Sequence, residues 1–238
     1  MLSALDVKGA FNNVPIDPAS RKYCGIITQD GVWEYCKMTF GFNTAPAHFQ
    51  QVIVDALETD GVGVPPPPHA TYMDDCTTGA GGARDEGELL RVAWGHTLAA
   101  MWRLALHGLP INLSKCHLLC RQLNLLGVVL FERRYQLGRK SLQKLIASEL
   151  PQTLRQLCAV AGRLEHVGKF LPDYSRLVKP IRALLRKNGG DWREQHTEAL
   201  NALAELAYRR LQLGLIDYTR AARLHVDCDE TDCSAVLV

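Results

Sequence analysis

Two adjacent aspartates, Asp74 and Asp75, lie in the middle of a short strand–turn–strand pattern over residues 71–77. Neighbouring carboxylates on a tight turn repel each other, and a bound divalent cation is the best explanation for such a pair. A fold that carries this turn needs paired strands on both sides of it and a further carboxylate from another strand. Asp6, near the end of an apolar strand, is the candidate for that third carboxylate.

The first half of the chain combines short strands with two helices. Asp30-Gly31 is a hairpin signal, and Gly108 is placed to end a helix. The four prolines at 65–68 exclude a helix or a paired strand there, so residues 61–68 are a loop. The predicted elements are a strand that leads into a short turn or helix over 2–14, hairpin strands over 24–28 and 32–38, a helix over 46–57, and an amphipathic helix over 86–107.

The second half is mainly helical. Thr153 is suited to cap a helix, because a threonine hydroxyl can accept a hydrogen bond from the first turn. The predicted elements are an apolar strand region over 123–131, helices over 138–148, 153–170, 177–185 and 197–213, and a final strand over 224–238.

The net charge of +2 hides an asymmetry along the chain. Residues 1–130 contain 9 Lys and Arg against 12 Asp and Glu, whereas residues 131–223 contain 18 against 9. A basic second half can bind a polyanion such as a nucleic acid. The alternative is a set of solvated helix faces, and charge alone favours that alternative.

The eight cysteines and the N-terminus indicate reduced thiols in an intracellular compartment, because no secretory signal precedes them. Cys116-His117 and Cys120 are rejected as a zinc site, since no second Cys/His pair lies at ligand spacing. Residues 118–123 are predicted to be buried core instead. No run of about 18 apolar residues occurs, so neither a membrane-spanning helix nor a membrane partner is expected.

Several motifs resemble, in order and spacing, those of gypsy-type retrotransposon reverse transcriptases. The most specific is Met38–Gln50, which resembles the family pattern Met-Pro-Phe-Gly-Leu-Thr-Asn-Ala-Pro-Ala-Thr-Phe-Gln. The other polymerase motifs are residues 5–11, Tyr72–Asp75, 113–116 and 125–127. Residues 154–157, 170–175 and 179–181 resemble the thumb of the family, and residues 191–192 and 226–237 resemble the start of its connection and RNase H-like region.

The resemblance implies an α+β fold. A polymerase palm, with an antiparallel sheet and helices on one face, is followed by a helical thumb and the start of an RNase H-like connection region. We expect the palm over 1–130 with the fingers largely missing, the thumb over 131–190, and a truncated connection region over 191–238. Because the chain starts only five residues before Asp6, we expect both ends to be cut from a longer polyprotein.

The resemblance also implies an RNA-directed DNA polymerase that transfers dNTPs onto a primer 3′-hydroxyl along an RNA or DNA template. Asp6, Asp74 and Asp75 would bind two Mg²⁺ ions, with Mn²⁺ as a substitute, and the Val7 carbonyl would add one oxygen. The family's fingers supply the grip on the triphosphate. We therefore expect little or no polymerase activity from the 238-residue chain alone.

Further roles follow from the same resemblance. Phe11 would be a steric gate against the ribose 2′-hydroxyl, with a simple core phenylalanine as the alternative. Lys115 would be a general acid near the leaving pyrophosphate, with a solvated lysine as the alternative. Asp227 would be the first RNase H carboxylate, whose partners lie beyond Val238. The remaining implied contacts are to the nucleotide, from Phe40, Gly41, Tyr72 and Met73, and to the primer terminus, from Leu126 and Gly127.

The chain departs from the family pattern at Thr39, which replaces a proline, and at His48, which replaces a small residue. Pro65–Pro68, His69 and Thr71 precede the aspartates and Cys76–Thr78 follow them, where the family has apolar strands. These residues are expected to weaken the hairpin that carries the aspartates. A catalytically inactive remnant that binds nucleic acid through its basic half is a second interpretation. Another palm enzyme, such as a nucleotide cyclase or an RNA-dependent RNA polymerase, is a third, disfavoured by Met38–Gln50 and the thumb-like tail.

Overall fold

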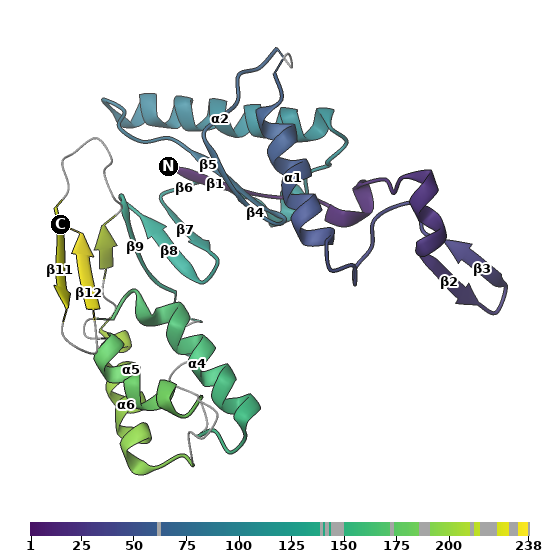
Figure 1. The fold of residues 1–238 in the computed structure, drawn as a ribbon. Helices are drawn as coiled ribbons and strands as arrows, with labels where there is room; N and C mark the ends of the chain where they lie inside the picture. Colours follow the sequence, from purple (N-terminus) through teal and green to yellow (C-terminus); the bar gives the residue numbers. More distant parts are fainter. Residues whose placement is uncertain are drawn as a thin grey trace. The chain divides into compact units, whose positions relative to one another are not determined.

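The computed structural model describes residues 1–60, 63–138, 140, 143, 150–171, 174–185, 191–209, 212–214, 223–228 and 233–237. The chain forms two compact units, Met1–Leu123 and Asn124–Val238 (Figure 1). Both units combine antiparallel strands with helices, so the expected α+β class is confirmed. None of the described helices is long and apolar enough to cross a membrane.

A four-stranded antiparallel sheet forms the centre of the first unit. Strand β1 is central, and it alternates half-buried and buried residues, so Ser3 and Leu5 point to the same face. The predicted strand at the N-terminus is therefore confirmed. In spatial order the strands are β4 (His69–Tyr72), β5 (Asp75–Gly79), β1 (Leu2–Asp6) and β6 (His117–Cys120).

Two helices, α1 (Ala45–Glu58) and α2 (Glu86–Leu106), pack with this sheet around one core. Helix α1 confirms the helix expected over 46–57, since its buried residues recur at helical spacing. Phe49 and Ile53 are completely buried and lie in the same cluster as Leu5 of β1. The helices thus hold the sheet whose strands end at the aspartates.

Helix α2 begins at the predicted residue and ends one residue before the predicted end, but it lacks the predicted amphipathic pattern. The Asp85 carboxylate caps it by accepting a hydrogen bond from the Glu88 N–H at 2.8 Å, and Gly108 follows its end with φ of +72°. Small residues such as Ala93 and Ala100 are buried, because they let the helix lie close to the sheet. Several large apolar side chains are instead exposed, at Leu90, Trp94, Leu98, Trp102 and Leu106, whereas Leu104 is completely buried.

A buried arginine connects α2 to the loop that follows α1. The Arg103 side chain is 1% exposed, and its guanidinium donates to the carbonyl oxygens of Thr59 at 2.9 Å and Val64 at 2.7 Å. A loop is found where the prolines predicted one, with residues 61 and 62 outside the described part of the chain.

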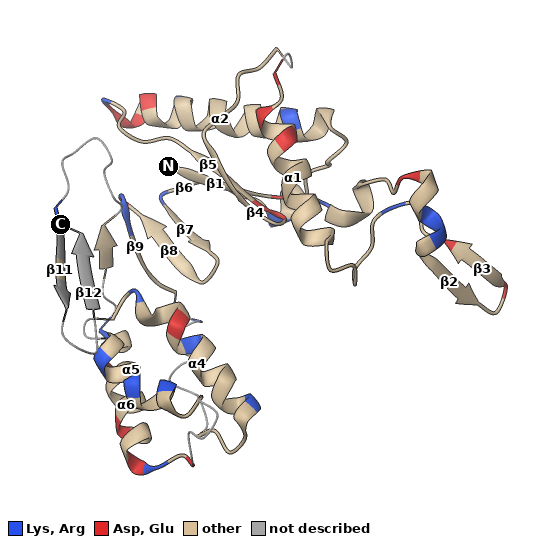
Figure 2. Cartoon of the chain, viewed as in Figure 1, with Lys and Arg blue, Asp and Glu red and all other residues tan. Residues whose placement is uncertain are grey.

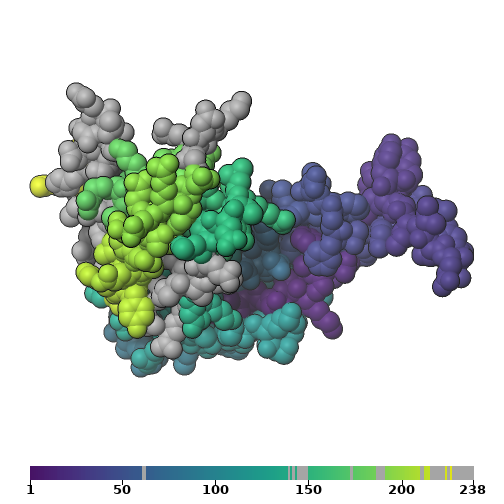
Figure 3. Space-filling model, turned by 90° about the horizontal axis from the view of Figure 1, so that it is seen from below, coloured from purple at the N-terminus to yellow at the C-terminus, as the bar shows by residue number. Residues whose placement is uncertain are grey.

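An exposed hairpin lies between β1 and α1. The chain passes through two 3-10 helices, η1 (Ala10–Asn13) and η2 (Pro18–Tyr23), before β2 (Gly25–Thr28) and β3 (Gly31–Glu34). The predicted hairpin is confirmed, although its second strand ends at Glu34 rather than at residue 38. Every residue of both strands is exposed, and the hairpin stands away from the core of the unit (Figure 3).

A third 3-10 helix, η3 (Leu113–Lys115), precedes β6. The prediction of buried core over 118–123 is wrong for most of these residues, since only Leu123 is fully buried. Strand β6 pairs with β1 alone and forms an edge of the sheet, so its side chains stay half-exposed.

A second antiparallel sheet has the order β10-β9-β8-β7. The apolar region predicted over 123–131 consists of two strands, β7 (Gln122–Leu125) and β8 (Val128–Phe131), joined by a turn. Strand β9 (Arg134–Leu137) follows, and β10 (Gln212–Gly214) pairs with it. The prediction of helix up to residue 213 is wrong there, because Gln212–Gly214 pairs with the otherwise open edge of β9.

Three helices form the core of the second unit, α4 (Leu154–Gly168), α5 (Tyr174–Ala183) and α6 (Glu194–Tyr208). Leu164, Ile181 and Leu203, one from each helix, are completely buried together. Both α5 and α6 begin three residues before their predicted starts. The helix predicted over 138–148 falls mostly outside the described residues.

The end of the chain forms a hairpin of β11 (Leu224–Cys228) and β12 (Cys233–Leu237). A single strand was expected over 224–238, so this prediction is wrong in the number of strands. Asp227 lies on β11 opposite Ser234.

Candidate active site

The register of the central strands brings Asp6 and Asp75 opposite each other. Strands β1 and β5 pair continuously from Leu2 with Gly79 to Asp6 with Asp75. The Cα atoms of directly opposed residues in antiparallel strands are about 4.5–5.5 Å apart. Asp74 comes directly before Asp75 in the turn between β4 and β5, so all three aspartates lie at one end of the sheet.

The turn that carries the aspartates has an unusual backbone. Met73 and Asp74 connect the paired residues Tyr72 and Asp75, and Met73 has φ of +54° whereas the φ of Asp74 is not positive. This pattern of signs is that of a type II′ turn, whose first central position favours glycine. A methionine there is strained and depends on local contacts to hold it. Tyr72 and Met73 are both exposed beside the aspartates.

The polar residues around the turn do not weaken the hairpin as expected. Cys76, Thr77 and Thr78 are buried, and the two threonine hydroxyls donate across to β4 and the residue before it. Thr77 Oγ1 donates to the Ala70 carbonyl at 2.8 Å, and Thr78 Oγ1 donates to the Pro68 carbonyl at 2.7 Å. Because each buried hydroxyl has a partner, these polar residues stabilise the hairpin.

The electrostatics of the turn favour a cation. Burial raises the pKa of Asp75, and the negative charges of Asp74 and Asp6 raise it further. Within the described part of the chain, no three His, Cys, Asp or Glu side chains are already arranged around one metal position. Carboxylate oxygens are nevertheless the ligands that Mg²⁺ prefers, so the chemistry of these donors fits a divalent ion.

The backbone after Asp6 connects it to the loop of Lys115. The Asn112 N–H donates to the Asp6 carbonyl at 2.8 Å, and the Lys115 N–H donates to the Asn112 carbonyl at 3.0 Å. The Lys115 side chain is exposed. Val7 is buried, and its carbonyl accepts only a long hydrogen bond, 3.4 Å from the Ala10 nitrogen.

Phe11 is part of an aromatic cluster next to the aspartate strand. Its ring makes edge contacts with Phe40 and Phe49, each with centroids 5.3 Å apart. Phe49 is completely buried, whereas 75% of Phe40 is exposed. Phe11 therefore lies where the core meets the surface. Gly41 follows Phe40 with φ of +100° and open space where a Cβ would lie.

The predicted primer-contact residues form a turn in the second unit. Leu126 has φ of +48° and Gly127 has φ of +80°, the pair of positive values that a type I′ hairpin turn requires. The Gly127 carbonyl accepts a hydrogen bond from the Gly138 N–H at 2.9 Å. Leu126 projects its apolar side chain, 48% exposed, at the tip of the β7–β8 hairpin.

The first 130 residues match one protein family. The model of that family, described as reverse transcriptase (RNA-dependent DNA polymerase), matches residues 1–130, which is more than half of the chain. The chain belongs to the reverse transcriptase family. The resemblance drawn from the motifs is thereby confirmed, and reverse transcriptase is favoured over nucleotide cyclases and RNA-dependent RNA polymerases.

Retrotransposon polyproteins are similar to this chain over its whole length. The transposon Tf2-3 polyprotein of Schizosaccharomyces pombe is 25% identical over 239 residues, covering 100% of this chain and 17% of the polyprotein. The Tf2-7 polyprotein of the same organism is 24% identical with the same coverage. The chain thus spans about one sixth of the length of the polyproteins that it matches.

Solved structures of foamy viral protease-reverse transcriptase share the fold. The one in complex with RNA/DNA hybrid has a TM-score of 0.80 and 20% identity, and the match covers 100% of this chain and 31% of that chain. Another, in complex with double-stranded DNA, has a TM-score of 0.81 and 20% identity, with 99% and 40% covered.

The contacts that support the aspartate turn were not predicted from the sequence. Gln50 and Thr71 received no role, yet their side chains meet beside Met73. Gln50 is the last residue of the motif Met38–Gln50. Its position next to the turn depends on how α1 packs on the sheet, which no local pattern encodes.

Proposed function

We propose that this chain carries the polymerase site of a reverse transcriptase, which extends a primer with dNTPs along an RNA or DNA template. One observation carries the proposal. Asp6 and Asp75 face each other on adjacent strands, with Asp74 beside them, inside the region that matches the family. Three carboxylates brought together from two strands and the adjoining turn are the donor set that nucleotidyl transfer requires.

Asp6, Asp74 and Asp75 would hold two Mg²⁺ ions, with Mn²⁺ as a substitute, and the Val7 carbonyl would add a further oxygen. When bound, the ions increase the acidity of the primer hydroxyl and neutralise charge on the triphosphate. Lys115, on the loop tied to Asp6 through Asn112, would donate a proton to the leaving pyrophosphate. Its exposure and its position near the aspartate strand support this role.

The aromatic cluster would bind the sugar of the incoming nucleotide. Phe11 would select against a 2′-hydroxyl, because its ring is held by contacts with Phe40 and Phe49 and cannot easily withdraw. The backbone at Phe40 and Gly41 would approach the nucleotide closely, since Gly41 has no side chain to obstruct it. Tyr72 and Met73 would contact the nucleotide from the exposed side of the turn.

The second half of the chain would bind the primer–template. Leu126 and Gly127 would position the primer terminus from the tip of the β7–β8 hairpin. We keep the division into palm over 1–130, thumb over 131–190 and connection region over 191–238 as part of the proposal, with Asp227 as its first RNase H-like carboxylate. Six cysteines are free thiols in the described part of the chain, which supports an intracellular place of action.

A second candidate function is nucleic-acid binding without catalysis. The excess of Lys and Arg over Asp and Glu in residues 131–223 favours it, because a polyanion is bound through such an excess whether or not chemistry follows.

Primer extension distinguishes the two candidates. The assay uses a labelled primer on an RNA template with dNTPs and Mg²⁺ or Mn²⁺, and it compares the wild-type chain with Asp75→Asn. We expect weak extension by the wild-type chain, and we expect this extension to be lost in Asp75→Asn because a metal ligand is removed. Extension that persists in Asp75→Asn would show that these aspartates are not the polymerase site. Nucleic-acid binding with no extension by either chain would favour the second candidate.

A further inference from the structure

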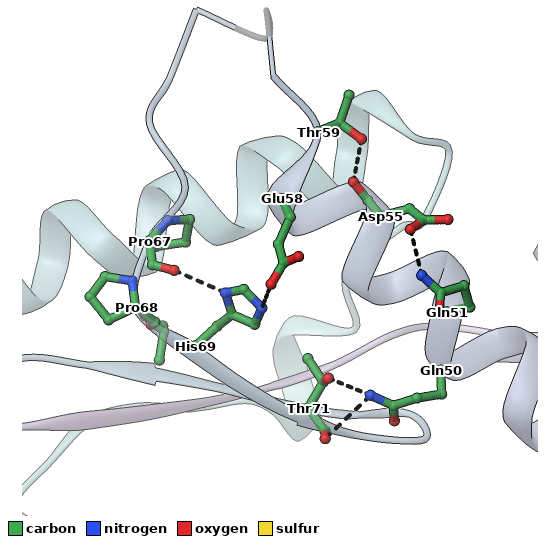
Figure 4. A network of polar contacts seen from close by, with 10 residues as sticks. Gln50, Gln51, Asp55, Glu58, Thr59, Pro67, Pro68, His69 and Thr71 are labelled. Atoms are coloured by element: carbon green, nitrogen blue, oxygen red, sulfur yellow. Dashed lines mark hydrogen bonds and ion pairs between the residues drawn. The ribbon is translucent and has the colours of Figure 1, made fainter.

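Gln50 contacts the aspartate turn through both ends of its side-chain amide. Its Nε2 donates to Thr71 Oγ1 at 2.5 Å and lies 3.4 Å from the Thr71 carbonyl oxygen. Its Oε1 accepts a hydrogen bond from the Met73 N–H at 2.6 Å. Figure 4 shows Gln50 reaching from α1 to Thr71. One side chain thus connects the helix to the strand before the turn and to the first residue within it.

The sheet supplies no hydrogen-bond acceptor for the Met73 N–H. Strand β4 is the edge of the sheet, so Thr71 has a strand neighbour on one side only. In a two-residue hairpin turn the flanking residues pair with each other, and the N–H of the first central residue remains unpaired. That residue is Met73. The Met73 N–H is exposed, so Gln50 supplies a fixed acceptor within the protein in place of water.

Met73 also needs support for a second reason. Its φ of +54° is a backbone conformation that residues with a side chain rarely adopt. Strained residues of this kind persist only when surrounding contacts hold them, and such contacts concentrate at functional sites. The hydrogen bond from Met73 to Gln50 is the described contact that fixes this residue from outside the hairpin.

We propose that Gln50 is a positioning residue that holds the Met73–Asp75 turn in the conformation that presents Asp74 and Asp75 to divalent cations. Gln50 acts through the Met73 backbone, so it is not itself a ligand. The orientation of its amide matters, because a flip would place Nε2 against the Met73 N–H and lose that hydrogen bond. This inference rests on the proposed metal site.

The next residue on the helix provides a matched control. Gln51 is the same residue type, it is exposed, and its Nε2 donates to Asp55 within α1 at 2.7 Å (Figure 4). Gln50→Met removes the amide while keeping most of the side-chain length. Gln51→Met makes the same chemical change one residue away, on a side chain whose described hydrogen bond stays within the helix.

The first measurement tests the contact without metal. Amide hydrogen exchange of the full chain, followed by NMR, reports on the Met73 N–H. We expect this amide to exchange about three- to tenfold faster in Gln50→Met, the change that loss of one hydrogen bond of ordinary strength produces. The amides of β1 and β5 should keep their protection, and Gln51→Met should match the wild type. Unchanged exchange at Met73 in Gln50→Met would overturn the proposal.

The second measurement tests the role. Titration of the full chain with Mn²⁺, followed by electron paramagnetic resonance, gives the metal affinity without requiring catalysis. We expect about three- to tenfold weaker binding in Gln50→Met, the equivalent of one hydrogen bond, and no change in Gln51→Met. Thr71→Val should also weaken binding, and Thr71→Ser should restore it because the hydroxyl returns. This pair replaces Gln50→Met should that variant fail to fold.

Two outcomes separate this inference from the proposed function. If Asp75→Asn loses Mn²⁺ binding while Gln50→Met binds as tightly as the wild type, the metal site stands and the positioning role is wrong. If Asp75→Asn binds Mn²⁺ as the wild type does, the proposed metal site is wrong, and the positioning role proposed for Gln50 is wrong as well.

Discussion

Asp75 shows how a single residue can be shaped by its neighbours. Burial raises its pKa above the ordinary value of 3.8, and the charges of Asp74 and Asp6 raise it further. The folded chain therefore holds a proton at Asp75 more tightly than the unfolded chain does. The resulting stability is fully present below pH 3.8 and is lost as the pH rises through the folded-state pKa. At neutral pH the ionised Asp75 thus destabilises the metal-free fold.

Removing this charge should stabilise the metal-free protein. We expect Asp75→Asn to raise the free energy of unfolding by about 0.5 kcal/mol at pH 7 in EDTA, a size typical of partly exposed charge interactions. The gain should shrink near pH 3, where Asp75 is protonated in both states. Urea unfolding at the two pH values measures it, with Asp30→Asn at the exposed hairpin as control. A loss of stability at pH 7 would contradict this account.

The neighbouring Cys76 is affected by burial in a different way. Burial raises the pKa of its thiol to about 12, and the nearby Cys116 also acts to raise this pKa. The thiol therefore stays protonated at neutral pH, and Cys76 serves the site by packing beneath the aspartates rather than as a ligand or nucleophile.

The N-termini of helices α2 and α4 carry capping signals that lie within a few residues in the sequence. Thr153 begins α4 with a capping box, in which its hydroxyl accepts from the Gln156 N–H at 3.3 Å and Gln156 Oε1 accepts from the Thr153 N–H at 3.1 Å. Asp85 begins α2 in a similar way. Both signals act over three residues, so they can be recognised without knowledge of the fold.

The capping box of α4 should contribute measurably to the stability of the second unit. We expect Thr153→Ala to lower the free energy of unfolding by about 1 kcal/mol, because a first-turn N–H loses its acceptor. Thr153→Ser should lower the free energy of unfolding by only roughly 0.3 kcal/mol, since the hydroxyl remains. Denaturant unfolding followed by circular dichroism measures both variants. Equal midpoints for Ala and wild type would show that the cap contributes nothing.

At the scale of the whole molecule, charge is distributed unevenly. Lys and Arg are frequent on α4 and α5 of the second unit (Figure 2). Some of these cations are already engaged, as in the ion pair of Arg182 with Glu165 at 2.5 Å and the contacts of Lys169 with the Tyr135 and Phe170 rings. The excess of basic residues over 131–223 nevertheless remains large.

Binding to a primer–template duplex should therefore depend strongly on salt. With about three phosphate contacts, the affinity should fall roughly fortyfold between 50 and 200 mM monovalent salt. Fluorescence anisotropy of a labelled duplex at several salt concentrations gives the slope, and a neutral fluorescent polymer of similar length serves as control. An affinity that does not change with salt would exclude binding through the basic half.

The sequence by itself determined the order of the motifs, the family, and the elements whose signals are local. Helices α1, α2 and α4 were predicted from apolar spacing and caps, and the β2–β3 hairpin from Asp30-Gly31. Elements that depend on distant partners were missed. Gln212–Gly214 is a strand only because β9 offers an open edge, and the exposed apolar side chains of α2 follow from how closely its small residues approach the sheet.

The residues of the candidate site could be predicted from the sequence, but their contacts could not. The three aspartates could be named from sequence, but only the register of β1 with β5 places Asp6 opposite Asp75, nearly 70 positions away along the chain. Likewise, only the packing of α1 beside β4 brings Gln50 to the Met73 N–H. The types of residue in a short stretch of sequence determine which chemical groups that stretch can supply. Which distant groups meet is decided by burial and backbone pairing over the whole unit, and these arise only when the chain is folded.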